Sequence, residues 1–243
     1  RGENAEETPL HVERRSIEVP TVEYQMLENQ VGYIYVTQFD EVTAKQFEDA
    51  IDDLEDQGME KLVIDLRNNP GGVLDTAVEM LAYVLPEDKL DGMLVYTADK
   101  NGEGDRYFCK DGKIQRESDD GSRDSRYPKE DGHELDVPLA VLVNGNSASA
   151  SEVFTGAVMD YDAGIVVGTT TFGKGIVQNL IPLGDGTAIK LTTAHYYTPN
   201  GFDLHGKGLE PDVVVEMDGE LQKKAVVELS EDNQLQAAIE AMN

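Results

Sequence analysis

A short run of alternating serines and alanines holds the residues best suited to nucleophilic chemistry. Ser147, Ser149 and Ser151 follow an apolar segment, Leu139–Val143, that predicts a buried strand. A serine hydroxyl becomes a nucleophile when a base takes its proton, and it then needs N–H donors for the oxyanion that forms. Ser149 stands where this strand meets a predicted helix, and the free amides of a helix N-terminus favour negative charge. The run therefore indicates a candidate catalytic serine.

The same run has a purely structural interpretation. Ser149-Ala-Ser-Glu152 matches the S-x-x-E capping box, which stabilises the first turn of a helix without any catalysis. The two interpretations are compatible, because a residue in the cap position can also expose its hydroxyl oxygen. The local pattern does not choose among the three hydroxyls.

Lys174 is the candidate for the base. It stands between Gly173 and Gly175, shortly after Ile165–Val167, an apolar segment that predicts another buried strand. Burial disfavours the ammonium form and lowers the pKa of a lysine, which is what a neutral general base requires. A solvated lysine in a surface loop is the alternative interpretation, and it is the commoner environment of this residue type.

A nucleotide-binding loop is a competing interpretation of the same glycines. Gly168 followed by Gly173-Lys174 matches the first seven positions of a P-loop, but Gly175 replaces the Ser or Thr that would hold magnesium. The next residues, Ile176–Pro182, predict a strand where a P-loop requires a helix. The sequence therefore argues against an NTPase.

Other catalytic arrangements have weaker support. His195 or His205 could serve a Ser-His-Asp triad, but no spacing selects either, and His205 near Asp203 resembles a site only weakly. Zinc would require more closely spaced His or Cys residues. Cys109, the single cysteine, lies in a charged stretch without a nearby histidine, so we expect a structural role. No metal and no organic cofactor is predicted.

The charge of the chain limits its partners. Among 243 residues, 20 Lys and Arg stand against 48 Asp and Glu, for a formal net charge of −28. Such a surface repels nucleic acid and anionic lipid, so neither is an expected partner. No apolar run approaches the roughly 20 residues that span a bilayer. Hydrophobic residues at 40% and charged residues at 28% are otherwise typical of a globular protein.

Strands and helices alternate along the chain. Val31–Val36, a helix from Thr43 to about Gly58, and Leu62–Leu66 form a β-α-β unit with parallel strands. Thr43 is a candidate cap for that helix, and Gly58 is expected to end it. The remaining predicted strands are Leu10–Val19, Met93–Thr97, Leu139–Val143, Ile165–Val167, Ile176–Pro182, Thr187–Ala194 and Val213–Val215, and the remaining helices are Ala77–Val84, Ala150–Tyr161 and Gln234–Met242.

These elements predict a mixed α/β fold with one main core. The polar segment at about 99–136 is expected to form a hairpin with a mobile tip or lid, and a disordered tip is the alternative. Tyr196–Gly201 is expected to form a turn. The helix at the C-terminus could mediate formation of a homo-oligomer or pack on its own core.

Six motifs together carry a family resemblance across roughly residues 25–216. They resemble, in the same order, motifs of the carboxy-terminal processing peptidases, or tail-specific proteases, which are serine proteases with a Ser-Lys dyad on a ClpP/crotonase-like α/β core. The matching segments are Phe39, Asp65–Gly72, Ser147–Glu152, Gly168–Gly175 with Gln178, Tyr196–Gly201, and Gly208–Asp212.

The resemblance assigns roles to individual residues. The family's nucleophile corresponds to the middle serine, Ser149, and its base, 25 residues later, corresponds to Lys174. Gln178 matches the glutamine that orients the lysine. The family's oxyanion hole uses the amide after the nucleophile, here Ala150, and a glycine amide from the loop after a strand. In that loop Gly72 is preferred and Gly71 is the alternative; a tight turn would also explain both glycines.

The resemblance also implies a domain organisation. Residues 1–24 are expected to be the remnant of a preceding PDZ domain and linker, 25–216 the protease core, and 217–243 a tail with a short helix. The family works outside the cytoplasm, so a periplasmic or cell-envelope location, with a membrane anchor in the full-length protein, is implied. The expected partners are protein or peptide substrates with accessible C-terminal tails.

The resemblance favours a serine endopeptidase that cuts protein substrates near their C-termini through an acyl-enzyme. The alternative is a peptide-binding scaffold without catalytic activity, because dyad alignment in this family can depend on the PDZ domain.

Overall fold

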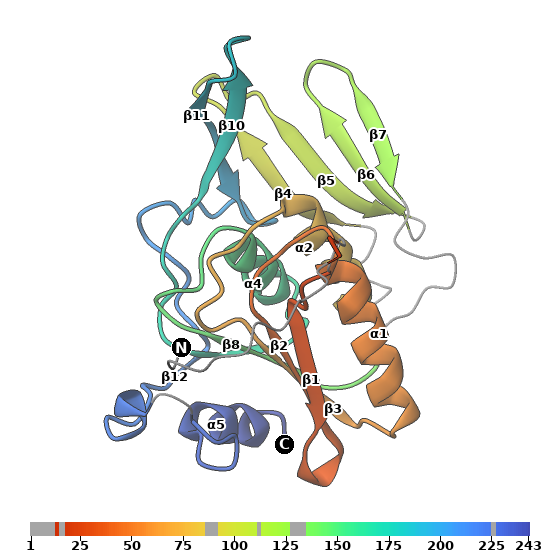
Figure 1. The fold of residues 1–243 in the computed structure, drawn as a ribbon, viewed down its shortest axis with the longest axis vertical. Coiled ribbons are helices and arrows are strands. Elements are labelled where there is room, and N and C mark those ends of the chain that lie inside the picture. Colours follow the sequence, from red (N-terminus) through yellow and green to blue (C-terminus); the bar gives the residue numbers. More distant parts are fainter. Residues whose placement is uncertain (1–12, 15–17, 86–91, 111–112, 127–134, 225–226) are drawn as a thin grey trace, which may run out of the picture.

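The computed structural model describes residues 13–14, 18–85, 92–110, 113–126, 135–224 and 227–243. Within these ranges the chain forms two six-stranded sheets (Figure 1), which confirms the predicted mixed α/β fold. In the first sheet β1 pairs antiparallel with β2, and every other neighbouring pair is parallel. The strands of this sheet, in spatial order, are β1 (Val22–Met26), β2 (Val31–Val36), β3 (Lys61–Asp65), β8 (Leu139–Val143), β9 (Ile165–Gly168) and β12 (Val213–Val214).

Helices cover both faces of the first sheet (Figure 1). Successive side chains of a strand point to opposite faces, so Ile64 and Val141 join the larger core cluster, whereas Val63 and Leu142 join a smaller one. The larger cluster is completed by α1 (Thr43–Asp56), α2 (Leu74–Val84) and α4 (Ala150–Asp160), and the smaller by α5 (Asn233–Ala241). The C-terminal helix therefore packs on its own core.

The first helix forms largely as its pattern predicts. Phe47 and Leu54 are fully buried and lie on the face that covers the sheet. Gly58, with φ of 85°, follows the helix end in the left-handed region that glycine adopts without strain. The predicted cap is wrong: Thr43 is the first helical residue, and its hydroxyl contacts the Thr21 hydroxyl at 2.7 Å. This contact ties α1 to the segment before β1.

The second sheet is wholly antiparallel and contains the polar segment. The predicted hairpin is present but larger than expected, because the segment adds three strands beside β4 rather than one hairpin. Cys109 is buried in it, as expected for a structural cysteine. Two parts of the predicted hairpin segment, residues 111–112 and 127–134, lie outside the described residues, and the mobile tip or lid stays a prediction. The strands, in spatial order, are β10 (Ile176–Pro182), β11 (Ala188–Tyr197), β4 (Met93–Ala98), β5 (Asp105–Lys110), β6 (Lys113–Ser118) and β7 (Arg123–Arg126).

Three further boundaries differ from the sequence predictions. The predicted strand Leu10–Val19 lies mostly outside the described residues, and β1, which follows Pro20, was not predicted. Strand β11 continues through Tyr197, so the turn predicted at Tyr196 begins only after it, at Thr198. Two short 3-10 helices, Glu28–Gln30 and Leu221–Lys223, complete the described elements.

A buried arginine ties the C-terminal tail to the first sheet. Arg67, just after β3, pairs with Asp65 and, at 2.7 Å, with Asp232, whose carboxylate also caps α5. Burial lowers the pKa of the Arg67 guanidinium, but hydrogen bonds and charges from both aspartates raise it more, so the cation is retained. Burial, followed by the charge of Asp65, raises the pKa of Tyr33, whose hydroxyl donates to Asp65.

Candidate active site

The candidate residues meet at the carboxyl ends of three neighbouring strands. Loops leave β3, β8 and β9 at the same edge of the parallel sheet, which is where open α/β sheets bind ligands. The Ala148 N–H donates to the Asn69 carbonyl at 3.0 Å, and the Phe172 N–H donates to the Ser147 carbonyl at 3.0 Å. Backbone hydrogen bonds therefore join the loop after β8, which carries Ser147, Ser149 and Ser151 and is called the serine loop below, to the loops after β3 and β9.

The structure distinguishes the three serines that the sequence could not separate. Ser147 and Ser151 are fully buried, and their hydroxyls donate to the carbonyls of Leu66 at 2.8 Å and Asn69 at 3.0 Å. Ser149 is only partly buried. Two serines therefore fasten the loop to the segment after β3, and the middle one is accessible.

Ser149 has an uncommon backbone conformation. Its φ of 57° and ψ of −115° fall outside the regions that residues other than glycine normally adopt. Such a conformation costs on the order of 1–3 kcal/mol and persists only where the surroundings enforce it. One constraint is Gly71, where an added Cβ would lie 2.8 Å from the Ser149 Cβ. The strained turn and the close glycine together fix the position of Ser149 at the start of α4.

Glu152 holds the serine loop against the loop after β9 that carries Lys174, which is called the lysine loop below. Its carboxylate is fully buried; Oε2 accepts the Ser149 N–H at 2.9 Å and the Lys174 N–H at 2.8 Å. Oε1 accepts the Thr171 hydroxyl at 2.6 Å and the Gly173 N–H at 2.7 Å. The predicted capping box is therefore present, but the same carboxylate also organises the loop that carries Lys174.

Removing the Glu152 charge should weaken this arrangement. In Glu152→Gln one of the two oxygens becomes an NH₂ donor, which faces N–H groups and leaves at least one buried donor unsatisfied, at about 1–3 kcal/mol. We expect the free energy of unfolding in urea to fall by that amount. Peptide hydrolysis should fall at least about tenfold in kcat/KM, because positioning errors in an active site reduce the rate steeply.

Glu60→Gln is the matched control for this prediction. Glu60 is exposed and lies just before β3, at the opposite end of that strand from the candidate site. This variant should change neither stability nor kcat/KM measurably. Equal effects of the two substitutions would show that Glu152 has no special role in positioning the loops.

Two backbone amides near Ser149 are available to a ligand. Among the residues that the structure describes, the N–H groups of Gly72 and Ala150 have no hydrogen-bond acceptor. The Gly71 N–H, in contrast, donates to the Asn69 side chain at 2.9 Å. An added Cβ at Gly72 would lie 1.9 Å from the Phe39 carbonyl oxygen, so only glycine fits. Of the two glycines considered for an oxyanion hole, Gly72 has the free donor.

The backbone around Lys174 is held tightly, whereas its side chain is partly exposed. Gly173 and Gly175 are both buried. The Gly173 carbonyl accepts the Gly206 N–H, and the Gly175 carbonyl accepts the Tyr196 N–H, each at 2.9 Å. A turn of the 204–208 segment and the end of β11 therefore hold the lysine loop in addition to Glu152.

The side chains of the expected dyad are not joined in this structure. Within the described part of the chain, no hydrogen bond links Ser149 to Lys174 or Lys174 to Gln178. Gln178 is exposed on β10, and its amide donates to the Thr192 hydroxyl at 3.3 Å. Catalytic hydrogen bonds are commonly long without substrate and shorten when it binds.

The histidines come together away from the serine. His195 Nδ1 lies 3.6 Å from an Asp203 carboxylate oxygen, and the His195 and His205 rings lie 4.9 Å apart edge to face. No hydrogen bond between described residues joins either ring to Ser149. Across the described ranges, no three His, Cys, Asp or Glu side chains are grouped so that they could hold a metal ion. The lysine loop is followed by strand β10, not by the helix of a P-loop.

Comparison with known proteins defines the class to which this site belongs. Residues 30–215 match the model of peptidase family S41, and the chain therefore belongs to that family. A probable CtpA-like serine protease from Staphylococcus aureus is 37% identical over 212 residues, which are 87% of this chain and 38% of the relative. A protein of the same name from Staphylococcus haemolyticus is 36% identical over 211 residues, with the same coverage of both chains. The resemblance to C-terminal processing peptidases is thereby confirmed.

Solved structures agree with this assignment. The photosystem II D1 C-terminal processing protease superposes with a TM-score of 0.64 at 29% identity, over 89% of this chain and 52% of that one. A lipoprotein from Streptococcus agalactiae shares the fold with a TM-score of 0.57 at 21% identity, over 84% of this chain and 68% of that one. The matched residues make up 38% of the two staphylococcal relatives, so this chain spans less than half the length of those curated proteins. None of its helices in the described ranges has the length and apolar character needed to cross a bilayer.

Proposed function

We propose that this chain is the catalytic core of a serine endopeptidase that cleaves protein substrates near their C-termini. The observation that carries the proposal is the shared anchor: the backbone N–H groups of Ser149 and Lys174 donate to the same oxygen of buried Glu152. A serine and a lysine from different strand ends are thereby held side by side. The names of two relatives, CtpA-like serine protease and D1 C-terminal processing protease, support the choice of reaction and substrate.

In the proposed mechanism, neutral Lys174 takes the proton from the Ser149 hydroxyl. The Ser149 oxygen attacks the scissile carbonyl carbon, and the resulting oxyanion accepts hydrogen bonds from the N–H groups of Gly72 and Ala150. Collapse of this intermediate breaks the C–N bond, and the protonated lysine gives its proton to the leaving amine. Water then hydrolyses the acyl-enzyme by the same route, with Lys174 again as base. Gln178, on β10, is proposed to orient Lys174 when substrate is bound.

The substrate is proposed to be a polypeptide with an accessible C-terminal tail, and the enzyme to work outside the cytoplasm. These proposals follow from the family and from the relatives' names. A strongly acidic chain is compatible with them, since neither nucleic acid nor anionic lipid would be attracted to it.

Covalent labelling of the serine tests the proposal directly. A fluorophosphonate probe reacts with activated serines, so the full-length protein should take up one equivalent, which mass spectrometry should locate on Ser149. Labelling should be lost in Lys174→Ala, because the hydroxyl then has no base. A label on another serine, or equal labelling of the two proteins, would contradict the proposed dyad.

A further inference from the structure

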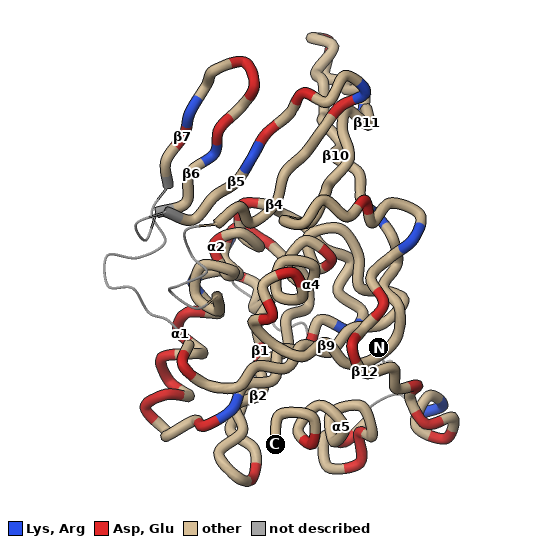
Figure 2. The backbone as a smooth tube through the Cα atoms, turned by 180° about the vertical axis from the view of Figure 1, so that it is seen from behind, with Lys and Arg blue, Asp and Glu red and all other residues tan. Residues whose placement is uncertain are grey.

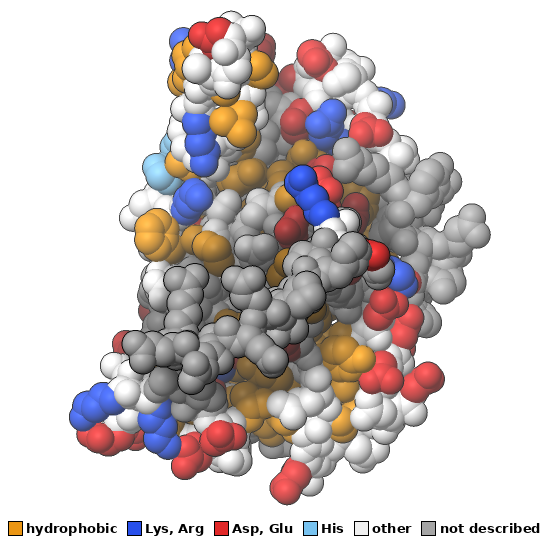
Figure 3. Space-filling view, viewed as in Figure 1, with side chains coloured by type: hydrophobic (Ala, Val, Ile, Leu, Met, Phe, Trp, Pro, Cys, Tyr) orange, Lys and Arg blue, Asp and Glu red, His pale blue; other side chains and the backbone are white. Residues whose placement is uncertain are grey.

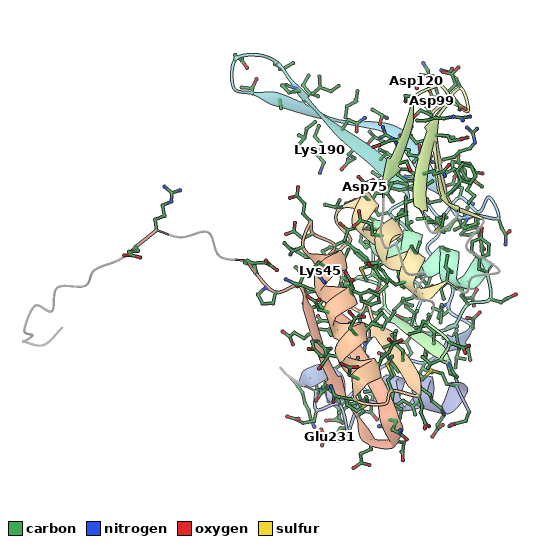
Figure 4. The ribbon with its side chains drawn as sticks, turned by 90° about the vertical axis from the view of Figure 1, so that its right-hand side faces the viewer. Lys45, Asp75, Asp99, Asp120, Lys190 and Glu231 are labelled. Carbon is green, nitrogen blue, oxygen red and sulfur yellow. The ribbon has the colours of Figure 1, made fainter. Side chains whose placement is uncertain are left out.

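Strand β10 forms a free edge of the second sheet. It is the last strand in the order, and its only partner in the described sheet is β11, with which it pairs from Ile176 to Pro182. Together the two strands project from the body of the molecule as an arm (Figure 1). In Figure 4 the arm, marked by Lys190, extends over open space beyond Asp75 at the start of α2. Among the described residues, one side of the β10 backbone therefore has no strand beside it.

The two edges of this sheet differ in charge. Strand β10, Ile-Val-Gln-Asn-Leu-Ile-Pro, has no charged residue, although the chain as a whole has a net charge of −28. The opposite edge strand, β7, is Arg-Asp-Ser-Arg. Figure 2 shows both colours of charge along β6 and β7 and neither along β10. Charged side chains discourage unwanted pairing, so β7 is protected along its length. Strand β10 has no charge, and its protective features are the bulge between Val177 and Gln178 and the terminal Pro182.

Apolar side chains also gather on the arm. Leu180 is 71% exposed and Ile181 44%, and on the partner strand Ile189 and Leu191 are about half exposed. Figure 3 shows hydrophobic groups along the arm at the upper left of the molecule. The register of the two strands places Ile181, Ile189 and Leu191 on one face of the arm and Leu180, paired with Lys190, on the other. A strand added beside β10 would contact apolar side chains on both faces.

The arm is continuous with the candidate active site. Strand β10 begins two residues after Lys174, and the Gly175 carbonyl between them is bonded to the Tyr196 N–H of β11. The start of the strand is thus fixed with respect to the lysine. Leu180 is six residues beyond Lys174, which at about 3.3 Å per residue places it at most roughly 20 Å along the strand. An extended peptide crossing the site could lie against β10 over that length.

We propose that the free edge of β10 binds the extended substrate as an added strand. Backbone hydrogen bonds would hold any sequence in register, and Leu180 and Ile181 would favour uncharged, apolar residues several positions from the scissile bond. This inference rests on the proposed peptidase function, since it assigns a substrate-binding surface to that same site. The occupant is the substrate chain rather than a second copy of the protein, because the edge leads directly to the lysine.

A negative charge placed on the β10 edge should raise KM for long peptide substrates and leave KM for short ones unchanged. In Leu180→Glu the exposed side chain tolerates the change, but a carboxylate replaces the apolar contact. We expect KM for an uncharged peptide of about ten residues on each side of the scissile bond to rise about tenfold, with kcat within about twofold. A peptide of about two residues on each side ends before Leu180, and its KM should not change. In a series of long peptides that each carry one lysine at a different position, one peptide should bind Leu180→Glu with most of the lost affinity restored, because its lysine pairs with the new carboxylate.

Ser125→Glu, on the protected edge β7, is the matched control and should leave both peptides unaffected. Fluorophosphonate labelling of Ser149 in Leu180→Glu separates this proposal from the peptidase assignment. Normal labelling with an unchanged KM for the long peptide would overturn the role of β10 and leave the dyad intact. If instead Leu180→Glu abolished a dimer seen by light scattering and left KM unchanged, the edge would be an interface between copies and the proposal would be wrong.

Discussion

Ser149→Ala should reduce hydrolysis of an unstructured peptide by at least about 10⁴-fold in kcat/KM, down to the limit of detection. The substitution removes the hydroxyl of a partly buried side chain and retains the Ser149 backbone N–H that donates to Glu152 at 2.9 Å. The strained turn is therefore kept, and we expect the free energy of unfolding to fall by about 0.5–2 kcal/mol at most, which is the usual contribution of an N-cap hydroxyl. The rate is measured with a fluorogenic peptide, and the stability by urea unfolding.

Ser151→Ala is the control, because it should lower stability without abolishing activity. The Ser151 hydroxyl is buried and donates to the Asn69 carbonyl at 3.0 Å, so its loss should cost about 0.5–1.5 kcal/mol of stability. Its kcat/KM should stay within about tenfold of the parent. Full activity in Ser149→Ala, or loss of activity in Ser151→Ala alone, would identify a different nucleophile.

Elements with a strong hydrophobic pattern were predictable from the sequence because the burial of apolar side chains determines each of them. The buried strands β2, β3, β8 and β9 are short apolar runs, and α1 buries the face that carries Phe47 and Leu54. The capping box at Ser149 was also predictable, since it depends on residues three positions apart. Local rules were sufficient wherever the partners of a residue were local or the whole element was buried.

The failures concern residues whose partners are distant in the sequence. Thr43 was predicted as a cap, but its hydroxyl lies against Thr21, 22 residues earlier. Glu152 was predicted only as half of a capping box, yet it also accepts hydrogen bonds from Thr171 and Gly173 in another loop. The S-x-x-E pattern predicts the capping role of Glu152. Its hydrogen bonds to the loop after β9 arise only because β8 and β9 are neighbours in the sheet.

The same reasoning explains why the sequence could not choose among three serines. All three hydroxyls share one local pattern, and only the carbonyls of Leu66 and Asn69, contributed by a different strand, separate Ser147 and Ser151 from Ser149. The choice of Ser149 in the sequence came from the family spacing to Lys174. The structure adds a physical reason for it, because only the middle serine is left accessible.

Lys174→Arg should be as inactive as Lys174→Ala, with kcat/KM reduced by at least about 10³-fold in both. Arginine keeps the positive charge and the length of the side chain, but it does not lose its proton in proteins and cannot act as a base. The backbone N–H that donates to Glu152 at 2.8 Å is kept in both variants, so the loop should stay in place. Rates at several pH values and urea unfolding check the two expectations.

The arginine variant separates two roles that the alanine variant confuses. If Lys174 acted only as a cation that attracts substrate or stabilises the oxyanion, arginine would restore much of the activity that alanine loses. If it acts as the proton acceptor for Ser149, arginine restores none. Lys207→Arg is the matched control, because Lys207 lies 5.0 Å from the Phe202 ring centroid, exposed and in a neighbouring turn, and should accept the change without loss. Substantial activity in Lys174→Arg would therefore exclude a neutral lysine base and leave the Ser149 assignment to be explained by another acceptor.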